Sequence, residues 1–339
     1  MNRRLIWIDN LKAYGVILVI IGHSIVQPIT YEYSALLMKL IYSFHMPLFF
    51  FISGFLFSSK ARGNYFSRKW KSLLLPYFIF QIISVLFINA FYYVTTGQLE
   101  RDPISTILSI FYLNGDVGWN APLWFLIVLA IMDILFYFFN KLKKHEWLQF
   151  FLVVVSCIIG WQLSQTGIKY PLGLQIVFSC FIFYYLGNLT KKYRIMKRLS
   201  RHLGVYFSIV IASGAFLVAS MLWLNGTRFV SLYDNYFGTS YVLFLLTALC
   251  GILFSFLIFQ MIYGLNILTV LGRQSILLLG TQYFLLLTFD KIGHILGIYS
   301  GTAFYLYVKV SLVLLTYLIA LYTWQKRKSE NRMAILKPS

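Results

Sequence analysis

Long apolar runs alternate with short polar segments along the whole chain. The runs reach or approach the roughly 20 residues that a membrane-spanning helix needs. They cover residues 5–28, 34–58, 72–95, 121–140, 147–164, 174–190, 203–224, 240–262, 275–290 and 303–324. None shows the strict apolar–polar alternation of barrel strands, so each is expected to satisfy its backbone as a helix. The pattern predicts an all-α, polytopic integral membrane protein with about ten transmembrane helices.

The polar segments give no sign of a second domain. No Gly/Ser linker, charge block or low-complexity stretch interrupts the pattern, so one transmembrane domain is predicted over residues 1–325, followed by a short basic tail over 326–339. Asp9 and Lys12 interrupt the first run and no small-residue cleavage site follows, so that run is expected to be a retained helix. The longest polar segment, over residues 96–120, is predicted to be an outer loop. It contains the apolar run "ISTILSIFYL", which is too short to span and is expected to lie on the membrane or dip into it.

The distribution of Lys and Arg predicts the orientation. If the N-terminus is cytoplasmic, 23 of the 29 basic residues lie at the inner side. The remaining six lie in or near the outer loops: Lys39, Arg101, Lys169, Arg228, Lys291 and Lys309. The positive-inside rule then places both termini in the cytoplasm, which agrees with an even number of helices.

Composition excludes the main alternative explanation of the basic charge. The chain is 60% hydrophobic and only 12% charged, and its net charge is +19, whereas soluble domains carry about 25% charged residues. A nucleic-acid-binding protein would need a basic face on a soluble module, and the sequence contains none, so no nucleic-acid partner is expected. The three cysteines lie in apolar runs without metal-ligand spacing, and no metal site is expected.

Lys12 and His23 are the first candidates for chemistry. They are 11 residues apart, close to three helical turns, so both face one side of the first helix about 16 Å apart. Ionisable groups in membrane helices usually face a cavity or the bundle interior. Lys12, like Asp9, could instead be an interfacial anchor. His23 could act as a neutral base near pH 7, or it could be a packing histidine.

His45 lies near the predicted middle of the second helix, two residues before Pro47. Proline removes a helical hydrogen bond, so the histidine could contribute to a site at a loosened turn. It could equally bond a freed carbonyl and fix the kink. The sequence does not favour either interpretation.

Arg68 and Lys71 share one helical face at the predicted cytoplasmic edge of the third helix. Such a pair can hold phosphates through charge-assisted hydrogen bonds, or it can be ordinary positive-inside charge. In the fourth helix, Trp124 is read as an interfacial anchor, and Asp133 is a buried carboxylate with no obvious partner. No Walker A loop, GxSxG elbow or HExxH motif occurs.

Five segments occur in an order that resembles one known family. They are "WIDNLKAYGVILVIIGHS", "FHMPLFFFISGFLF", "RKWKSLLLPY", "PLWFL" and "LGRQSILLL". The chain resembles the membrane-bound acyltransferase 3 family, which includes O-antigen, exopolysaccharide and capsule O-acetyltransferases. The form of the second segment is similar to the branch of fucose 4-O-acetylase and enterobacterial common antigen O-acetyltransferase. The family is characterised by a basic residue in the first helix that is followed, after ten intervening residues, by a histidine. Lys12 and His23 match this spacing.

The resemblance implies an acyl-CoA-dependent O-acyltransferase of a bacterial inner (cytoplasmic) membrane. The donor, usually acetyl-CoA, would come from the cytoplasm, and the acceptor would be a sugar hydroxyl of a surface polysaccharide or its lipid-linked precursor. His23 would be the catalytic base, supported by Lys12, with His45 as a further candidate. Arg68 and Lys71 match the family's basic pair and would bind the donor, without a metal.

The resemblance has two departures. Relatives often carry a histidine near the position of Gln282, and many carry a fused soluble domain that this chain lacks. The enzyme would act alone in the lipid bilayer or with separate glycan-assembly proteins. A transporter or flippase of glycan units without transferase activity is the main alternative. It would favour inverted repeats with broken helices at matching positions, and no convincing repeat relates the two halves.

Overall fold

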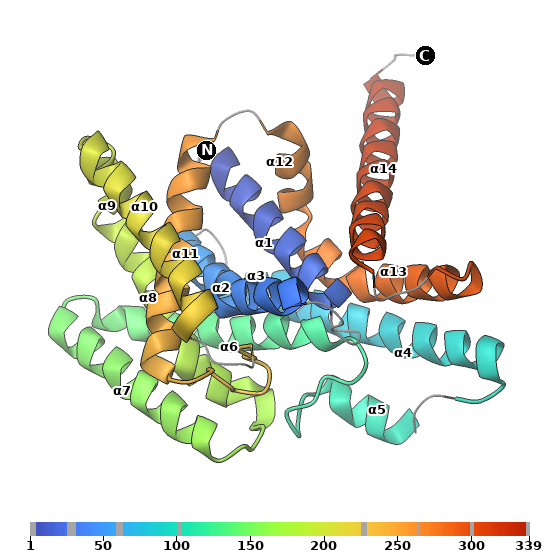
Figure 1. The fold of residues 1–339 in the computed structure, drawn as a ribbon, viewed down its shortest axis with the longest axis horizontal. Coiled ribbons are helices and arrows are strands. Elements are labelled where there is room, and N and C mark those ends of the chain that lie inside the picture. The colour runs from blue at the N-terminus through green and yellow to red at the C-terminus, as the bar shows by residue number, and fades with distance from the viewer. Residues whose placement is uncertain are drawn as a thin grey trace. The chain divides into compact units, whose positions relative to one another are not determined.

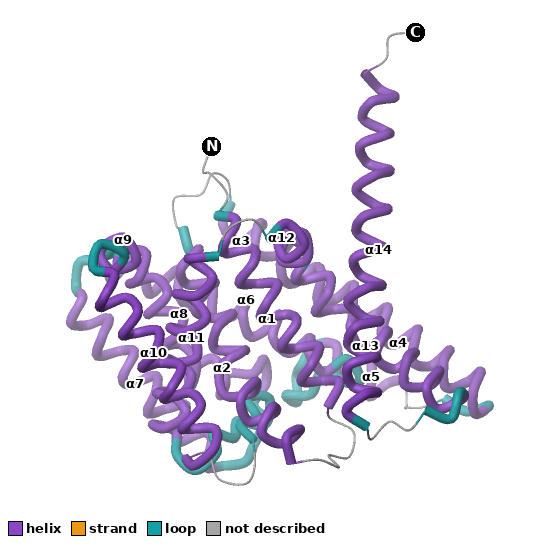
Figure 2. Tube along the Cα trace, turned by 45° about the horizontal axis from the view of Figure 1, so that its top comes forward, coloured by secondary structure: helices purple, strands orange, loops and turns teal. Residues whose placement is uncertain are grey.

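The computed structural model describes residues 5–25, 32–58, 64–99, 103–224, 229–262, 265–298 and 302–336. Helices dominate this part of the chain, and Figure 2 shows them in purple with loops in teal. The only extended pairing among the described residues is an isolated bridge between Ser231 and Tyr236. The all-α prediction is therefore confirmed.

Fourteen α-helices follow one another along the described chain, as labelled in Figure 1. They are α1 (Ile6–Ile25), α2 (Glu32–Leu56), α3 (Tyr65–Lys69), α4 (Leu75–Thr96), α5 (Pro103–Ile110), α6 (Trp124–Phe139), α7 (Glu146–Gln165), α8 (Leu174–Lys192), α9 (Ile195–Leu199), α10 (Leu203–Ala219), α11 (Tyr241–Met261), α12 (Asn266–Arg273), α13 (Ser275–Ile295) and α14 (Ala303–Leu336). In the described residues, ten spans are long and apolar enough to cross a membrane, which confirms the predicted number.

The start of the third span differs from its predicted position. The third span begins at Tyr65 rather than near residue 72, because α3 and a π-helical turn (Trp70–Leu74) lead directly into α4. Pro76 accounts for this turn: it lacks an N–H, and its ring would clash with the carbonyl four residues earlier. The predicted basic tail is helical to Leu336, because its Lys, Arg, Glu and Ala residues are good helix formers.

The chain divides into two compact units. The first combines residues 1–34 with residues 259–339, and α1 packs in it against α12, α13 and α14. Gly272 brings α12 against the backbone of α1, because a side chain there would collide with the carbonyl oxygen of Asp9. The N-terminal helix is thus enclosed by the C-terminal part of the chain.

The second unit covers residues 35–258 and holds the helices from α3 to α10 together with most of α2 and α11. Glycines again set its closest contacts. A side chain at Gly54 of α2 would meet the carbonyl of Tyr184 in α8, and one at Gly187 of α8 would meet the carbonyl of Phe51 in α2. These two reciprocal contacts hold α2 and α8 at backbone distance, as small residues commonly do in membrane bundles.

Candidate functional site

His23 lies in the last turn of α1 and contacts α13 of the same unit. The hydroxyl of Tyr283 is 3.3 Å from His23 Nδ1, and the two rings meet edge to face with centroids 5.1 Å apart. The tyrosine therefore engages one ring nitrogen and orients the imidazole. An orienting group on Nδ1 is what a histidine needs in order to exchange protons at Nε2.

Sequence reasoning did not find Tyr283. It identified the neighbouring Gln282, which is buried and donates its amide to the carbonyl of Leu279 at 3.3 Å. The residue that contacts His23, however, is one position further along.

The first turn of α1 is also tied to the C-terminal part of the chain. Thr269 of α12 donates to Asn10 at 2.7 Å, and Arg273 Nε lies 3.6 Å from the buried carboxylate of Asp9. These contacts join the "WIDN" segment to α12, and Arg273 belongs to the "LGRQS" segment. Lys12 lies one turn after Asp9 on this continuous helix, so its axial separation from His23 stays at about 16 Å.

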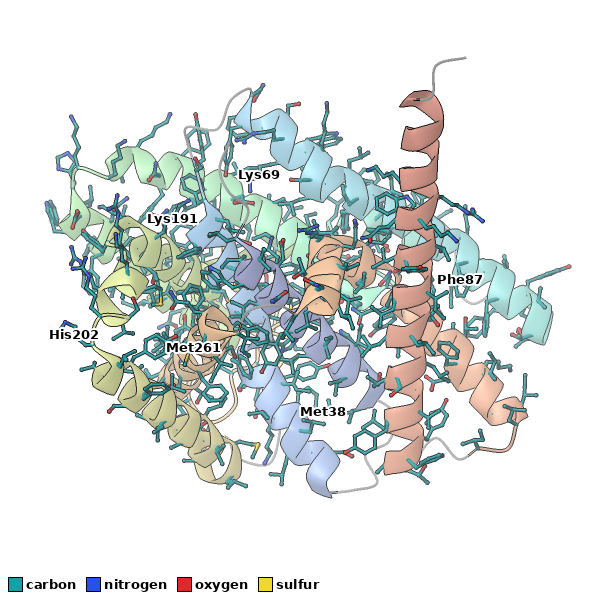
Figure 3. All side chains as sticks on the ribbon, turned by 90° about the horizontal axis from the view of Figure 1, so that it is seen from above. Met38, Lys69, Phe87, Lys191, His202 and Met261 are labelled. Atoms are coloured by element: carbon teal, nitrogen blue, oxygen red, sulfur yellow. The ribbon has the colours of Figure 1, made fainter. Side chains whose placement is uncertain are left out.

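The predicted phosphate-binding pair lies in the second unit. Arg68 lies in the last turn of the short helix α3, Lys71 lies in the π-helical turn, and both side chains are exposed. π-turns are rare and often mark functional positions. Lys69, between them in sequence, binds Asp133 of α6, with Nζ 2.6 Å from Oδ2. The charged ends of Arg68 and Lys69 each lie 5.7 Å from the centre of the Tyr65 ring. Figure 3 labels Lys69 at the light-blue ribbon.

Asp133, for which the sequence offered no partner, is thus at the centre of a polar cluster. The hydroxyl of Tyr184 donates to its second carboxylate oxygen, and that of Tyr65 donates to its backbone carbonyl at 3.1 Å. The cluster anchors the basic segment to α6 and α8. Beside it lies a cavity of about 400 Å³. Its walls are Asn64, Phe66, Ser67, Lys69, Trp70, Leu74, Ala130 and Ile134.

His45 is buried in α2, and its Nδ1 lies 2.7 Å from the carbonyl of Ile41 in the same helix. Pro47 frees the carbonyl of residue 43, four positions before it, so this is not the carbonyl that His45 bonds. The ring also meets Tyr42 edge to face. The side chain is held by its own helix, which favours packing over chemistry.

The structure also changes the interpretation of Trp124. It is buried rather than exposed at an interface, and its ring lies 6.5 Å from that of Tyr233. Of the predicted site residues, Lys12 and His23 share the first unit, while His45, Arg68 and Lys71 share the second.

Comparison with known proteins identifies the family. A family model described as "Acyltransferase domain", that of acyltransferase 3, matches residues 5–325. The chain belongs to this family. Neither the curated proteins nor the solved structures contain a match. The chain is therefore a multi-pass membrane acyltransferase, and the five segments identified in the sequence all lie inside the matched region.

Proposed function

We propose that this acyltransferase moves an acetyl or other short acyl group from acyl-CoA to a sugar hydroxyl. The acceptor is a cell-surface polysaccharide or its lipid-linked precursor at the cytoplasmic membrane of a bacterium. The observation that supports this most directly is the contact of Tyr283 with His23 Nδ1. It leaves the histidine oriented for proton transfer in the part of the chain that matches the family's basic-residue-to-histidine spacing.

The reaction assigns one proton-transfer step to His23. In the required tautomer, Nδ1–H donates to Tyr283 and Nε2 carries the lone pair. Nε2 takes the proton of the sugar hydroxyl as its oxygen attacks the thioester carbonyl carbon. The carbon–sulfur bond then breaks, and the protonated histidine returns the proton to the leaving thiolate. The products are the sugar ester and free CoA.

Donor binding is assigned to the basic segment of the second unit. CoA carries several phosphate charges, and Arg68 and Lys71 expose two cationic side chains on one stretch of backbone. Lys69 holds this stretch to Asp133. His45 is left out of the chemistry because its ring is bonded within α2.

The test is acceptor-dependent release of CoA by the purified protein in detergent. The probes are acetyl-CoA and neutral oligosaccharides obtained by partial acid hydrolysis of the source cells' surface polysaccharide. We expect His23→Ala to lower the rate roughly 10²–10⁴-fold, the usual contribution of a general base. Tyr283→Phe should lower it less, because the imidazole is kept but loses its orienting partner.

Melting temperatures separate chemistry from folding. A His23→Ala protein that melts like the wild type but releases no CoA supports the assignment. Wild-type protein that neither binds nor cleaves acetyl-CoA would overturn the proposal and favour a transporter of glycan units.

A further inference from the structure

Three loops of the second unit meet at the side that the charge pattern predicts to be outer. They cover residues 111–120, 166–173 and 229–240. The backbone N–H of Leu172 donates to the carbonyl of Tyr112 at 3.1 Å, and the hydroxyl of Tyr233 donates to Asp116 at 2.8 Å. The first of these loops therefore contacts both of the others. We call this assembly the outer loop cluster.

The backbone of the outer loop cluster is unusual. Tyr112, Leu172 and Asn235 have φ values of 56°, 59° and 52°, in the left-handed region that residues other than glycine seldom adopt. Such conformations persist only where surrounding contacts hold them, and they occur often at binding sites. A definite local structure is thus maintained here at an energetic cost.

Three buried polar atoms of this region have no hydrogen-bond partner among the described residues. They are the hydroxyl of Tyr112, the Nε2 amide of Gln175 and the Nδ2 amide of Asn235, and all three side chains are more than nine-tenths buried. Native proteins rarely leave such groups unsatisfied. Three unsatisfied polar atoms in one connected region indicate that a bound molecule supplies their hydrogen-bond partners.

The amide of Gln175 has a defined orientation, and the amide of Asn235 lies next to the same network. Gln175 Oε1 accepts from the backbone N–H of Tyr170 at 3.2 Å, and Asn235 Oδ1 lies 3.3 Å from the hydroxyl of Ser179. That hydroxyl donates its single proton to the carbonyl of Gln175 at 2.7 Å, so Ser179 links the two amides without giving a proton to Asn235. Gln175 therefore keeps its NH₂ group as the unused donor, and Asn235 keeps an unused polar atom of its side-chain amide.

Charge decides against an anionic ligand. The charged residues of the three loops, within the described chain, are Asp116, Lys169 and Asp234, which sum to −1. The one cation is already engaged: Lys169 Nζ lies 3.3 Å from Asp234 and 3.6 Å from the centre of the Tyr233 ring. A phosphate or carboxylate would meet net negative charge. A neutral hydroxyl both donates and accepts, so it fits the amide donor of Gln175, either atom of the Asn235 amide, a phenol and nearby carboxylates.

Two tyrosines of the cluster, Tyr112 and Tyr233, are neutral donors at ordinary pH. Burial raises the pKa of the Tyr112 hydroxyl. Burial also raises the pKa of Tyr233, and its hydrogen bond to Asp116 raises it further. Both phenols therefore keep their protons. Tyr233 in addition presents an aromatic ring next to Trp124.

We propose that the outer loop cluster binds a neutral pyranose of the glycan acceptor, with Tyr112, Gln175 and Asn235 as the residues that hydrogen-bond its hydroxyls. The inference rests on the proposed function for the identity of the ligand as a glycan. A site with buried groups built to pair with hydroxyls discriminates strongly against molecules that lack them. The cluster would thus select the acceptor by its hydroxyl groups.

Tyr112→Phe is the sharpest test, because it removes only a hydroxyl that has no partner in the protein. The melting temperature should stay the same or rise, since an unsatisfied buried group is lost. The KM for the oligosaccharide mixture should rise roughly five- to tenfold, the effect of one neutral hydrogen bond, with the KM for acetyl-CoA unchanged. Gln175→Glu, which keeps the acceptor for Tyr170, should also raise the oligosaccharide KM.

Tyr206→Phe is the matched control. Tyr206 is a buried tyrosine of the same unit whose hydroxyl does have a protein partner, the carbonyl of Leu257 at 2.6 Å. Its loss should lower the melting temperature and leave both KM values unchanged. The proposal is overturned if Tyr112→Phe has no effect on oligosaccharide KM or binding, which would assign the three polar atoms to solvent.

Direct binding separates this proposal from the proposed function. Saturation-transfer NMR measures binding of the same oligosaccharides without any turnover. If the wild type binds them and Tyr112→Phe weakens binding, the site holds even where no CoA is released. If the wild type releases CoA with these acceptors but Tyr112→Phe matches it in every measurement, only the site is wrong. A wild type that does not bind them overturns the site.

Discussion

Two ion pairs inside spanning helices have the same chemistry and opposite burial. Lys69 and Asp133 of the second unit meet at 2.6 Å, and Lys309 and Asp290 of the first unit meet at 2.8 Å. In the first pair the carboxylate is 1% exposed and the lysine 28%, whereas in the second the lysine is 3% exposed and the carboxylate 26%. Each pair therefore buries one charge completely and leaves the opposite charge partly accessible.

The accessible member of each pair determines which charge that region exposes to its surroundings. Beside Arg68 and Lys71, the accessible member of the pair is the cation Lys69, which adds to a surface suited to phosphates. Near the predicted outer end of α13, the accessible member is the anion Asp290, which also accepts from Tyr305 at 2.9 Å. The buried member of each pair depends on its partner, because an uncompensated charge away from water is very costly. Removing the accessible partner should therefore be worse than removing the buried one.

Lys69→Met should give the largest loss. It leaves the buried carboxylate of Asp133 without its cation, and we expect a loss of about 3–5 kcal/mol in the free energy of unfolding. Asp133→Asn removes the buried charge itself and leaves a lysine that can reach water, so its loss should be smaller. Denaturant unfolding in detergent micelles measures both variants. Equal losses would show that burial does not determine the cost at this pair.

Asp290→Asn should give the next largest loss in the free energy of unfolding. The variant leaves Lys309 charged and buried, but asparagine still offers an oxygen to Lys309 and to Tyr305. We therefore expect a loss of about 1–3 kcal/mol. Lys309→Met should cost less, since the remaining carboxylate is partly accessible. Lys291→Gln, which removes an exposed charge one position along the helix, is the control and should leave the melting temperature unchanged.

The ion pairs also show which parts of the structure can be predicted from the sequence and which cannot. The ten spans follow from the apolar runs, because a bilayer requires continuous apolar helices. The pairing of Lys69 with Asp133 does not follow, because 64 residues separate them and helix packing alone brings them together. The early start of the third span could have been inferred from Pro76, which favours a widened turn before it.

The candidate site likewise contains residues that the sequence predicts and residues that it does not. The spacing of Lys12 and His23 locates a histidine on a helix that the family match covers. Its partner Tyr283 is 260 residues away and belongs to a helix whose rotation about its axis the apolar pattern does not define. The unsatisfied atoms of the outer loop cluster depend on loop conformations with positive φ, for which Tyr112 and Leu172 carry no sequence signal.

Arg273→Gln tests the same argument on a third pair. Asp9 is buried and Arg273 is accessible, as in the pair of Asp133 and Lys69, but the charged atoms are 3.6 Å apart and no hydrogen bond is formed between them. Because the geometry is poorer, we expect a loss of about 1 kcal/mol. Thermal unfolding of the purified variant measures it. A loss as large as that of Lys69→Met would show that Asp9 depends on Arg273 alone.

Glu146→Gln should give the smallest effect of the series. Glu146 begins α7 and meets Lys192 at 2.8 Å, a distance as short as that of the pair Asp290 and Lys309, but neither side chain is buried: Glu146 is 57% exposed and Lys192 35%. Water already solvates each charge, and holding two flexible side chains together costs entropy, so exposed pairs add little. We expect no measurable change in melting temperature at low or high salt. A clear drop would mean that distance rather than burial sets the cost of breaking a pair, and the contrast between Asp133 and Asp290 would lose its explanation.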